Sequence, residues 1–168
     1  MSFDQFVKAL PEGLVYAPIY AKGTRMLSGK PATGKNPLEA SYEQKFGPAD
    51  VALAVKRNSD LKAVGVFTGI RGNGIVILDV DRNLSKYLKA WGSSLDGAPI
   101  ITSTKANAAK YLFRVPEELW ADVKGHGLRK EDGGDYEILW GRQGVVCGAY
   151  PGGKVSKPGQ YLLDGSLA

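Results

Sequence analysis

The sequence predicts an α+β fold in which short helices flank a mixed or antiparallel sheet. Apolar, β-branched runs recur through the middle of the chain, and turn-forming clusters rich in Gly, Asn or Asp separate them. Helical spacing of apolar residues is confined to brief segments between these runs. With 168 residues, 43% of them hydrophobic, the chain can bury one core, so residues 1–168 are expected to form a single domain.

The first third of the chain is expected to contain two helices, an extended segment and a loop. Apolar side chains gather on one side of residues 2–9, and residues 14–20 favour an extended backbone. Residues 22–37 are rich in Gly, Lys, Ser, Thr and Pro, which predicts a basic loop that meets either phosphates or only water. A second helix is expected to start at Asp50, as its N-cap, and to end at residues 58–60.

The middle of the chain predicts a hairpin followed by a helix. Residues 64–68 and 75–79 are β-branched runs, and the glycines within residues 69–74 permit a tight connection between them. Apolar residues at helical spacing then predict a helix over residues 83–91.

The last third predicts further strands around one short helix. Residues 100–103 and 110–115 are expected to form strands on either side of a polar loop, and residues 116–123 a short helix. Residues 125–134 are expected to be a charged, mobile loop. A Gly/Pro-rich tail should close the chain after a final strand pair, which turns at residues 141–143 and spans residues 136–140 and 144–147.

Composition excludes several classes of function. Cys147 is the only cysteine and His126 the only histidine, so neither a zinc site nor a histidine-based triad is expected. No apolar run approaches the roughly 18 residues that span a bilayer, and the first residues lack an export signal. A soluble, cytoplasmic protein without a membrane partner is therefore expected. The net charge of +5 favours a polyanionic partner such as nucleic acid.

Two carboxylates follow the most apolar strand. Residues 75–78 are apolar on both faces, which is typical of a buried strand, and they run directly into Asp79 and Asp81. Alternation places both side chains on one face, about 7 Å apart along the strand. Such a pair repels itself unless a hard cation neutralises it, and Mg²⁺ prefers oxygen ligands. The pair predicts a divalent metal site, with a plain turn-forming role as the alternative.

Three charged side chains on later strands extend this hypothesis. Glu137 shares a strand face with Leu139, so it either faces solvent or completes the metal site as a third ligand. Lys110 and Arg114 share a face of their strand with Leu112. This face either lines a nucleoside triphosphate or is simply solvated.

Two glycine-rich segments imitate nucleotide-binding motifs. Residues 29–36 nearly spell a P-loop, but Asn36 replaces the hydroxyl residue that would reach magnesium, and Pro37 follows directly. Residues 69–74 lead into a strand rather than a helix, so their glycines predict a turn and not a dinucleotide site.

Several ordered segments of the chain resemble the bifunctional primase-polymerase family, part of the archaeo-eukaryotic primase superfamily. The resemblance covers roughly residues 14–153, and it depends on the order and spacing of the segments, since an acid-x-acid pair alone is common. It implies a primase-polymerase catalytic core with an RRM-like sheet. The segments are Val66-Phe67-Thr68-Gly69, Ile77-Leu78-Asp79-Val80-Asp81, Ile101-Thr102-Ser103, Tyr111-Leu112-Phe113-Arg114-Val115-Pro116, and Glu137 before Gly144-Val145-Val146.

The resemblance assigns roles to individual residues. In this family an acid-x-acid motif and a later acid bind the catalytic metals, which implies metal ligation by Asp79, Asp81 and Glu137. The family usually places a histidine against the phosphates of the incoming nucleotide, and here Lys110 stands on the matching strand. A lysine holds phosphate as a point charge but does not reproduce the directed hydrogen bond of imidazole. Further substrate contacts are implied for Thr68, Ser103, Lys105 and Arg142.

The expected function is template-dependent nucleotidyl transfer by a DNA primase or polymerase. It would use Mg²⁺ or Mn²⁺, take NTPs or dNTPs, and bind a single-stranded DNA template and a primer. The resemblance implies replication of a plasmid, phage or other mobile element, with the chain as the N-terminal part of a longer protein that carries a helicase domain.

Two other functions stay open from the residues. Lys110 in place of histidine, together with the basic loop, suggests a replication-initiator module that binds DNA without catalysis. Paired carboxylates also position an attacking water, which suggests a metal-dependent nuclease.

Overall fold

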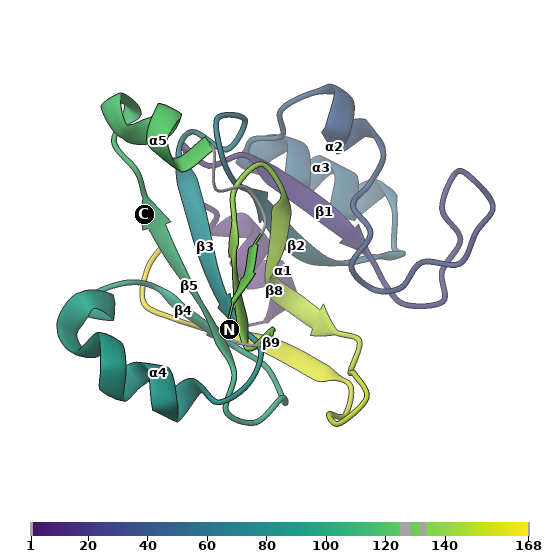
Figure 1. The fold of residues 1–168 in the computed structure, drawn as a ribbon. Coiled ribbons are helices and arrows are strands. Elements are labelled where there is room, and N and C mark those ends of the chain that lie inside the picture. Colours follow the sequence, from purple (N-terminus) through teal and green to yellow (C-terminus); the bar gives the residue numbers. More distant parts are fainter. Residues whose placement is uncertain (1, 125–128, 132–133, 168) are drawn as a thin grey trace.

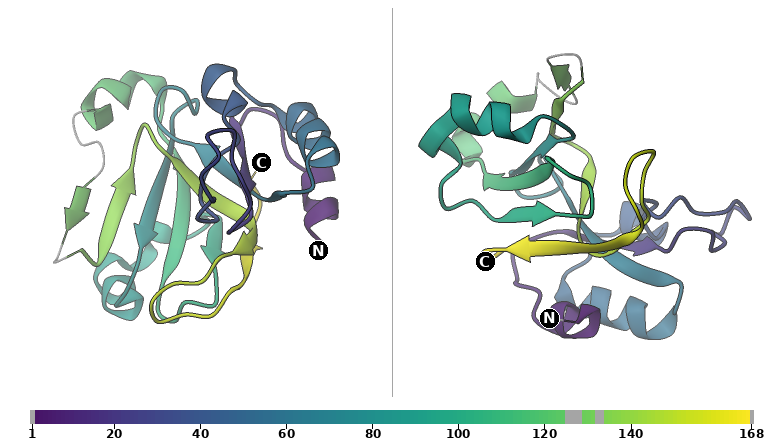
Figure 2. Two further views of the ribbon diagram at one scale, coloured as in Figure 1. Left: turned by 90° about the vertical axis from the view of Figure 1, so that its right-hand side faces the viewer. Right: turned by 90° about the horizontal axis from the view of Figure 1, so that it is seen from below.

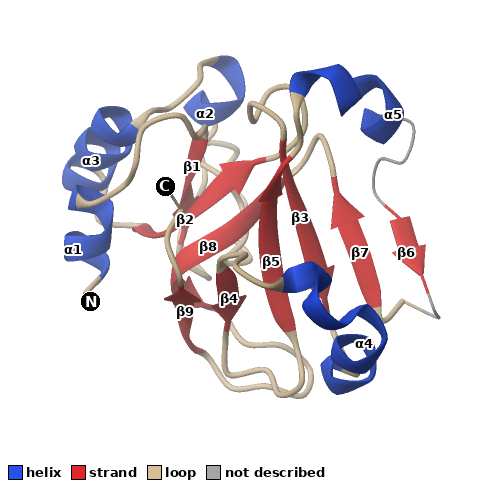
Figure 3. Cartoon of the chain, turned by 90° about the vertical axis from the view of Figure 1, so that its left-hand side faces the viewer, coloured by secondary structure: helices blue, strands red, loops and turns tan. Residues whose placement is uncertain are grey.

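The computed structural model describes residues 2–124, 129–131 and 134–167, which form the α+β fold that the sequence predicts. The strands in these residues belong to one sheet with the order β1-β2-β8-β9-β4-β5-β3-β7-β6, and all the pairings are antiparallel. The sheet is strongly curled, and the helices gather at two sides of it (Figures 1 and 3).

One half of the sheet carries the N-terminal helices. Helix α3 contacts β1 and β2, and α1 contacts both α3 and β8. All five residues of β1 are buried, as expected for a strand that is covered on both faces. The elements of this half are α1 (Phe3–Lys8), β1 (Tyr16–Tyr20), α2 (Ala40–Glu43), α3 (Pro48–Arg57), β2 (Leu61–Phe67), β8 (Gln143–Tyr150) and β9 (Gly159–Asp164).

The other half of the sheet packs against helix α4. Tyr87 of α4 meets Tyr136 of β7 edge to face, with ring centroids 5.1 Å apart, and this contact fixes the helix on the outside of the sheet. The elements of this half are β3 (Ile75–Val80), α4 (Leu84–Trp91), η1 (Gly92–Leu95), β4 (Ile100–Thr102), β5 (Ala109–Arg114), η2 (Glu117–Leu119), α5 (Trp120–Lys124), β6 (Arg129–Glu131) and β7 (Tyr136–Leu139).

The curl brings β8 across the face of β3 and β5. A Cβ atom on Gly144 would lie only 2.7 Å from Cδ1 of Ile77, so β8 passes close to β3 at this point. Ile77, Val66 and Val146 are fully buried in one core that both halves of the sheet share. The crossing strand β8 therefore covers the inner face of β3 around Ile77.

The predicted hairpin of residues 64–68 and 75–79 is wrong. β2 pairs with β1 and β8, β3 pairs with β5 and β7, and only one bridge, Gly69 to Ile75, joins the two segments. The reason is the curl of the sheet. Residues 69–74 carry the chain from one half of the sheet to the other, and each strand finds its partners in its own half.

The predicted pairing of the last two strands is also wrong. β7 pairs with β3 and β6, whereas β8 pairs with β2 and β9. Gly141, with φ +87°, turns the chain away so that β8 crosses into the first half. The supposed tail contains β9, and part of the supposed loop is β6. His126 and the rest of residues 125–128 and 132–133 lie outside the described residues.

The predicted helices are present, with one change in capping. Helix α3 begins at Pro48, with Gly47 as its N-cap, rather than at Asp50. The Asp50 carboxylate instead accepts a hydrogen bond from the Gly47 N–H at 2.8 Å, which is the reciprocal half of a capping box. The short helix α2 was not predicted. None of the helices in the described part of the chain has the length and apolar character needed to cross a membrane.

Candidate active site

A row of charged residues crosses three adjacent strands. The register sets Asp79 of β3 opposite Glu137 of β7 on one side and opposite Lys110 of β5 on the other. Residues paired in an antiparallel ladder project from the same face, with Cα atoms about 4.5–5.5 Å apart. Two residues earlier on β3, the same face carries the fully buried Ile77. The row therefore marks the point at which an apolar sheet face becomes charged.

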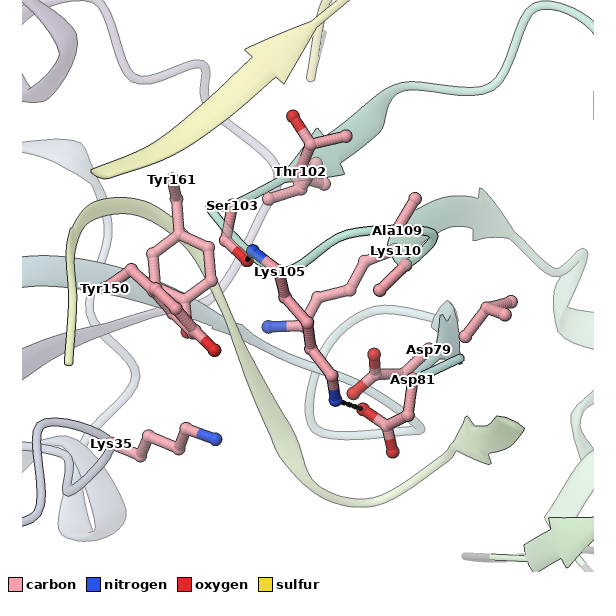
Figure 4. A pocket seen from close by; sticks show the side chains of 13 residues that line it. Lys35, Asp79, Asp81, Thr102, Ser103, Lys105, Ala109, Lys110, Tyr150 and Tyr161 are labelled. Carbon is pink, nitrogen blue, oxygen red and sulfur yellow. Dashed lines mark hydrogen bonds and ion pairs between the residues drawn. The ribbon is translucent and has the colours of Figure 1, made fainter. Parts of the chain in front are cut away.

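One pocket opens beside Asp79 and Lys110 of this row. It is lined by five of the nine residues predicted for the site, and Glu137, predicted as a metal ligand, is not among its lining residues. Asp79 and Asp81 form one wall, and the loop after β4 lies across from them (Figure 4). Lys35, Tyr150 and Tyr161 come from segments that were not assigned to the site. The polar or aromatic side chains that line the pocket belong to Lys35, Asp79, Asp81, Thr102, Ser103, Lys105, Lys110, Tyr150 and Tyr161.

The loop between β4 and β5 holds Lys105 against the acids. Its Nζ lies 3.4 Å from Oδ1 of Asp81, and its backbone N–H donates to Oγ of Ser103 at 3.2 Å. The loop is fixed at both sides. Asn107, which has φ +54°, accepts a hydrogen bond from the Ser85 N–H at 2.9 Å, and the Thr104 hydroxyl donates to the Lys157 carbonyl. These hydrogen bonds fix the loop, and the loop holds Lys105 at the pocket.

Lys110 extends from β5 into the space between the sheet halves. Its Nζ donates to the Val145 carbonyl at 3.0 Å and lies 4.7 Å from the centroid of the Tyr161 ring. Burial lowers the pKa of the Lys110 ammonium below its ordinary value, and the Asp79 carboxylate opposes that shift. Lys110 therefore places positive charge beneath the acids while its own position is fixed by β8 and β9.

The Asp79 carboxylate has no hydrogen-bond donor among the described residues. Burial raises its pKa, Lys110 opposes the shift, and the charges of Asp81 and Glu137 raise it further. A half-buried carboxylate beside two other acids is energetically costly unless a cation joins it. Asp79 is the strongest candidate here for a residue kept in place by function rather than by stability.

The acids fit a hard divalent cation by the chemistry of their donors. Within the described residues, no three His, Cys, Asp or Glu side chains are clustered as a metal centre, and the Asp81 carboxylate pairs with Lys105. The backbone register nevertheless places Asp79 and Glu137 side by side, with Asp81 following on the same edge. Mg²⁺ and Mn²⁺ take such all-oxygen ligand sets and retain water or phosphate oxygens.

Three of the predicted substrate contacts lie elsewhere. Thr68 is fully buried, and its hydroxyl exchanges hydrogen bonds with the Arg142 backbone, so it joins two turns. The exposed side chain of Arg142 does not line the pocket. Arg114 lies at the opposite end of β5 from Lys110, where its Nη1 donates to the Asn73 carbonyl at 3.1 Å. Leu112 between them is buried, so a fully solvated face for this strand is wrong.

The residues that sequence reasoning missed reach the site through non-local contacts. Lys35 belongs to the basic loop, and its carbonyl accepts a hydrogen bond from Nε2 of Gln143 at 3.1 Å. Tyr150 and Tyr161 pack edge to face at 5.3 Å, and both come from the segment that was predicted to be a Gly/Pro-rich tail. The basic composition of residues 22–37 was the only signal that pointed to Lys35.

Comparison with known proteins adds no relative. No protein-family model matches the sequence, and a search of curated proteins finds no significant match.

Proposed function

We propose that the chain is a template-dependent nucleotidyltransferase, a DNA primase or polymerase that acts on NTPs or dNTPs. The observation that carries this proposal is the charged row: Asp79 lies opposite Glu137 on the neighbouring strand, and Asp79, Asp81 and three lysines line one pocket. Acids alone would suit several hydrolases. A cluster of lysines facing the acids suits a polyanionic substrate that arrives with its own metal.

Two different sets of residues would contact the metal and the phosphates. Asp79, Asp81 and Glu137 would hold Mg²⁺ or Mn²⁺, which would neutralise phosphate charge and favour attack by a hydroxyl group. Lys35, Lys105 and Lys110 line the pocket, where their ammonium groups would contact the triphosphate. Lys105 would exchange its partner Asp81 for a phosphate oxygen when the substrate enters, and the Asp81 carboxylate would then bind the metal.

The resemblance to the primase-polymerase family supports the same assignment and extends it. It favours a primase-polymerase core, cytoplasmic replication of a plasmid, phage or other mobile element, and a single-stranded template with primer. It also favours a helicase domain downstream in a longer polypeptide. Each of these is part of the proposal.

The direct test is strand synthesis. The chain is incubated with primed and unprimed single-stranded templates, labelled NTPs or dNTPs, and Mg²⁺ or Mn²⁺. We expect extension by the wild type and loss of at least about a hundredfold in Asp79→Ala/Asp81→Ala. A matched control, Glu117→Ala/Glu118→Ala, removes two exposed acids from η2 and should keep full activity.

Full extension by folded Asp79→Ala/Asp81→Ala would contradict the proposal. Cleavage of the template without added triphosphates, lost in the same variant, would instead identify a metal-dependent nuclease.

One observation favours a second function, a DNA-binding initiator module without catalysis. The ammonium of Lys110 is already engaged by Val145 and Tyr161, and that of Lys105 by Asp81. Two of the cations that would hold a triphosphate therefore have partners within the chain. Template binding of normal strength without synthesis under any metal would establish this module in place of the polymerase.

A further inference from the structure

Two loops that are distant in sequence carry the excess positive charge of the chain. The first, residues 22–37, and the second, residues 151–158, contain six cations and no Asp or Glu. The whole chain has a net charge of +5, so the remainder has no positive excess. The cations are Lys22, Arg25, Lys30 and Lys35 in the first loop, and Lys154 and Lys157 in the second.

The fold places these loops beside each other. A Cβ atom on Gly34, where φ is +93°, would lie 2.6 Å from Cβ of Pro151, so the base of the first loop touches the start of the second. Both loops project from the same side of the sheet, away from helix α4 (Figures 1 and 2). The second loop is also joined to the site, because the Lys157 carbonyl accepts the hydroxyl hydrogen of Thr104 next to Lys105.

A groove of about 370 Å³ lies between the loops and adjoins the site pocket. Its walls are mainly apolar and include Tyr150, which also lines the site. Lys22 and Lys62 border it. The remaining lining side chains include Tyr20, Ala63, Ala149, Pro151 and Pro158. The name loop groove is used below for the surface that consists of this groove and the six cations of the two loops.

The composition of the loop groove fits one kind of partner. Single-stranded nucleic acid is bound by cations that follow the phosphates and by apolar or aromatic surfaces against the bases. A duplex hides its bases and would leave the apolar walls unused. An acid-free pair of loops with an apolar groove between them satisfies both requirements of a single strand.

We propose that the loop groove binds single-stranded nucleic acid and leads the strand to the site pocket. This deepens the proposed function and rests on it for the role of the strand as template or primer. Phosphates contact the lysines of both loops, unpaired bases lie against Pro151 and Pro158, and the strand reaches the acids past Tyr150.

The test measures binding of labelled single-stranded DNA and RNA of one sequence by fluorescence anisotropy, without metal or triphosphate. Lys22→Ala/Lys30→Ala and Lys154→Ala/Lys157→Ala each remove two exposed cations. We expect each to weaken binding roughly tenfold and to reduce the slope of log K against log salt by about 1.4, or about 0.7 per contact. The matched control, Lys86→Ala/Lys89→Ala, removes two exposed lysines from α4 and should bind like the wild type.

The outcomes separate this inference from the proposed function. Selective loss in the loop variants supports the loop groove even if no synthesis is ever detected, and the tighter of DNA and RNA identifies the strand. Wild-type binding by both loop variants would overturn the inference while leaving strand synthesis intact. An equal loss in the α4 control, or tighter binding of a duplex with the same losses, would also overturn it.

Discussion

Asp79 and Asp135 are neighbouring acids with opposite surroundings. Asp135 immediately precedes β7 and is buried, and its carboxylate accepts hydrogen bonds from Arg82 Nε at 2.6 Å, Tyr87 OH at 2.8 Å and Asn83 Nδ2 at 3.3 Å. Those bonds, led by that of Tyr87, hold the pKa of Asp135 below its usual range. Asp79 lies one strand away without such a donor, and burial raises its pKa.

The difference separates an acid whose carboxylate receives several hydrogen bonds from one without a donor among the described residues. Asp135 joins the start of α4 to β7, and its carbonyl also accepts the Asp81 N–H at 2.7 Å, so it helps to place the end of β3. Asp79 receives no comparable support and keeps its oxygens available. This contrast supports the proposal that Asp79 is kept for function, because residues kept for function often lower stability.

Replacement of Asp79 by Asn should have the largest effect, because it is expected to lower activity and raise stability at the same time. Nucleotide incorporation is expected to fall at least about a hundredfold. The melting temperature should rise by about 3 °C, because the buried charge disappears. A raised pKa in the folded state means that ionisation of Asp79 destabilises the fold only above the unfolded pKa, about 3.9. The stability gain should therefore vanish below about pH 4, and a lower melting temperature at neutral pH would contradict the comparison.

Replacement of Asp135 by Asn should have the opposite effect on stability. We expect the melting temperature to fall by roughly 5 °C at pH 7, because accepted hydrogen bonds are lost, while incorporation below that temperature is retained. The folded pKa of Asp135 is lowered, so its stabilising contribution is present above about pH 3.9 and is lost as the pH falls through the folded pKa. Melting curves between about pH 3 and about pH 7 should show the wild type and the variant converging in acid. A constant difference over that range would contradict the role of the charge.

The Lys110→Met variant tests the positive charge that faces Asp79 from strand β5. The variant keeps the apolar stem and removes the ammonium that faces Asp79. We expect the KM for the triphosphate to rise about tenfold, the loss of one charge-assisted contact. Initial rates over a range of triphosphate concentrations measure the effect. An unchanged KM would assign Lys110 to the core rather than to the substrate.

Arg114→Ala and Arg142→Ala should have the smallest effects. Both side chains lie outside the pocket, so incorporation is expected to change by less than about twofold, which is typical of surface substitutions. Steady-state rates at limiting triphosphate provide the measurement. A large loss in Arg142→Ala would show that the turn between β7 and β8 closes over the substrate.

Local patterns in the sequence predicted what depends on local geometry. Alternation along β3 and β7 placed Asp79 and Glu137 on definable strand faces, and the register sets them opposite each other. Helical spacing likewise predicted α4 within a residue of its observed bounds. The candidate acids could therefore be chosen without a structure.

Strand pairing and the completed pocket depend on contacts that no local pattern encodes. β8 pairs with β2 of the first half rather than with β7, and its Gly144 passes close to Ile77 of β3. Lys35 and Tyr161 reach the acids only because the sheet curls. Tyr161 was hidden in a segment whose Gly and Pro content suggested a tail.

The central claim, that Asp79 is kept available for a cation, is tested most directly by Mn²⁺ binding. Electron paramagnetic resonance measures free Mn²⁺ during titration of the wild type, Asp79→Asn and Asp135→Asn, each with a non-hydrolysable triphosphate. We predict that the wild type and Asp135→Asn bind alike and that Asp79→Asn binds at least about tenfold more weakly. Equal binding by all three proteins would contradict the claim.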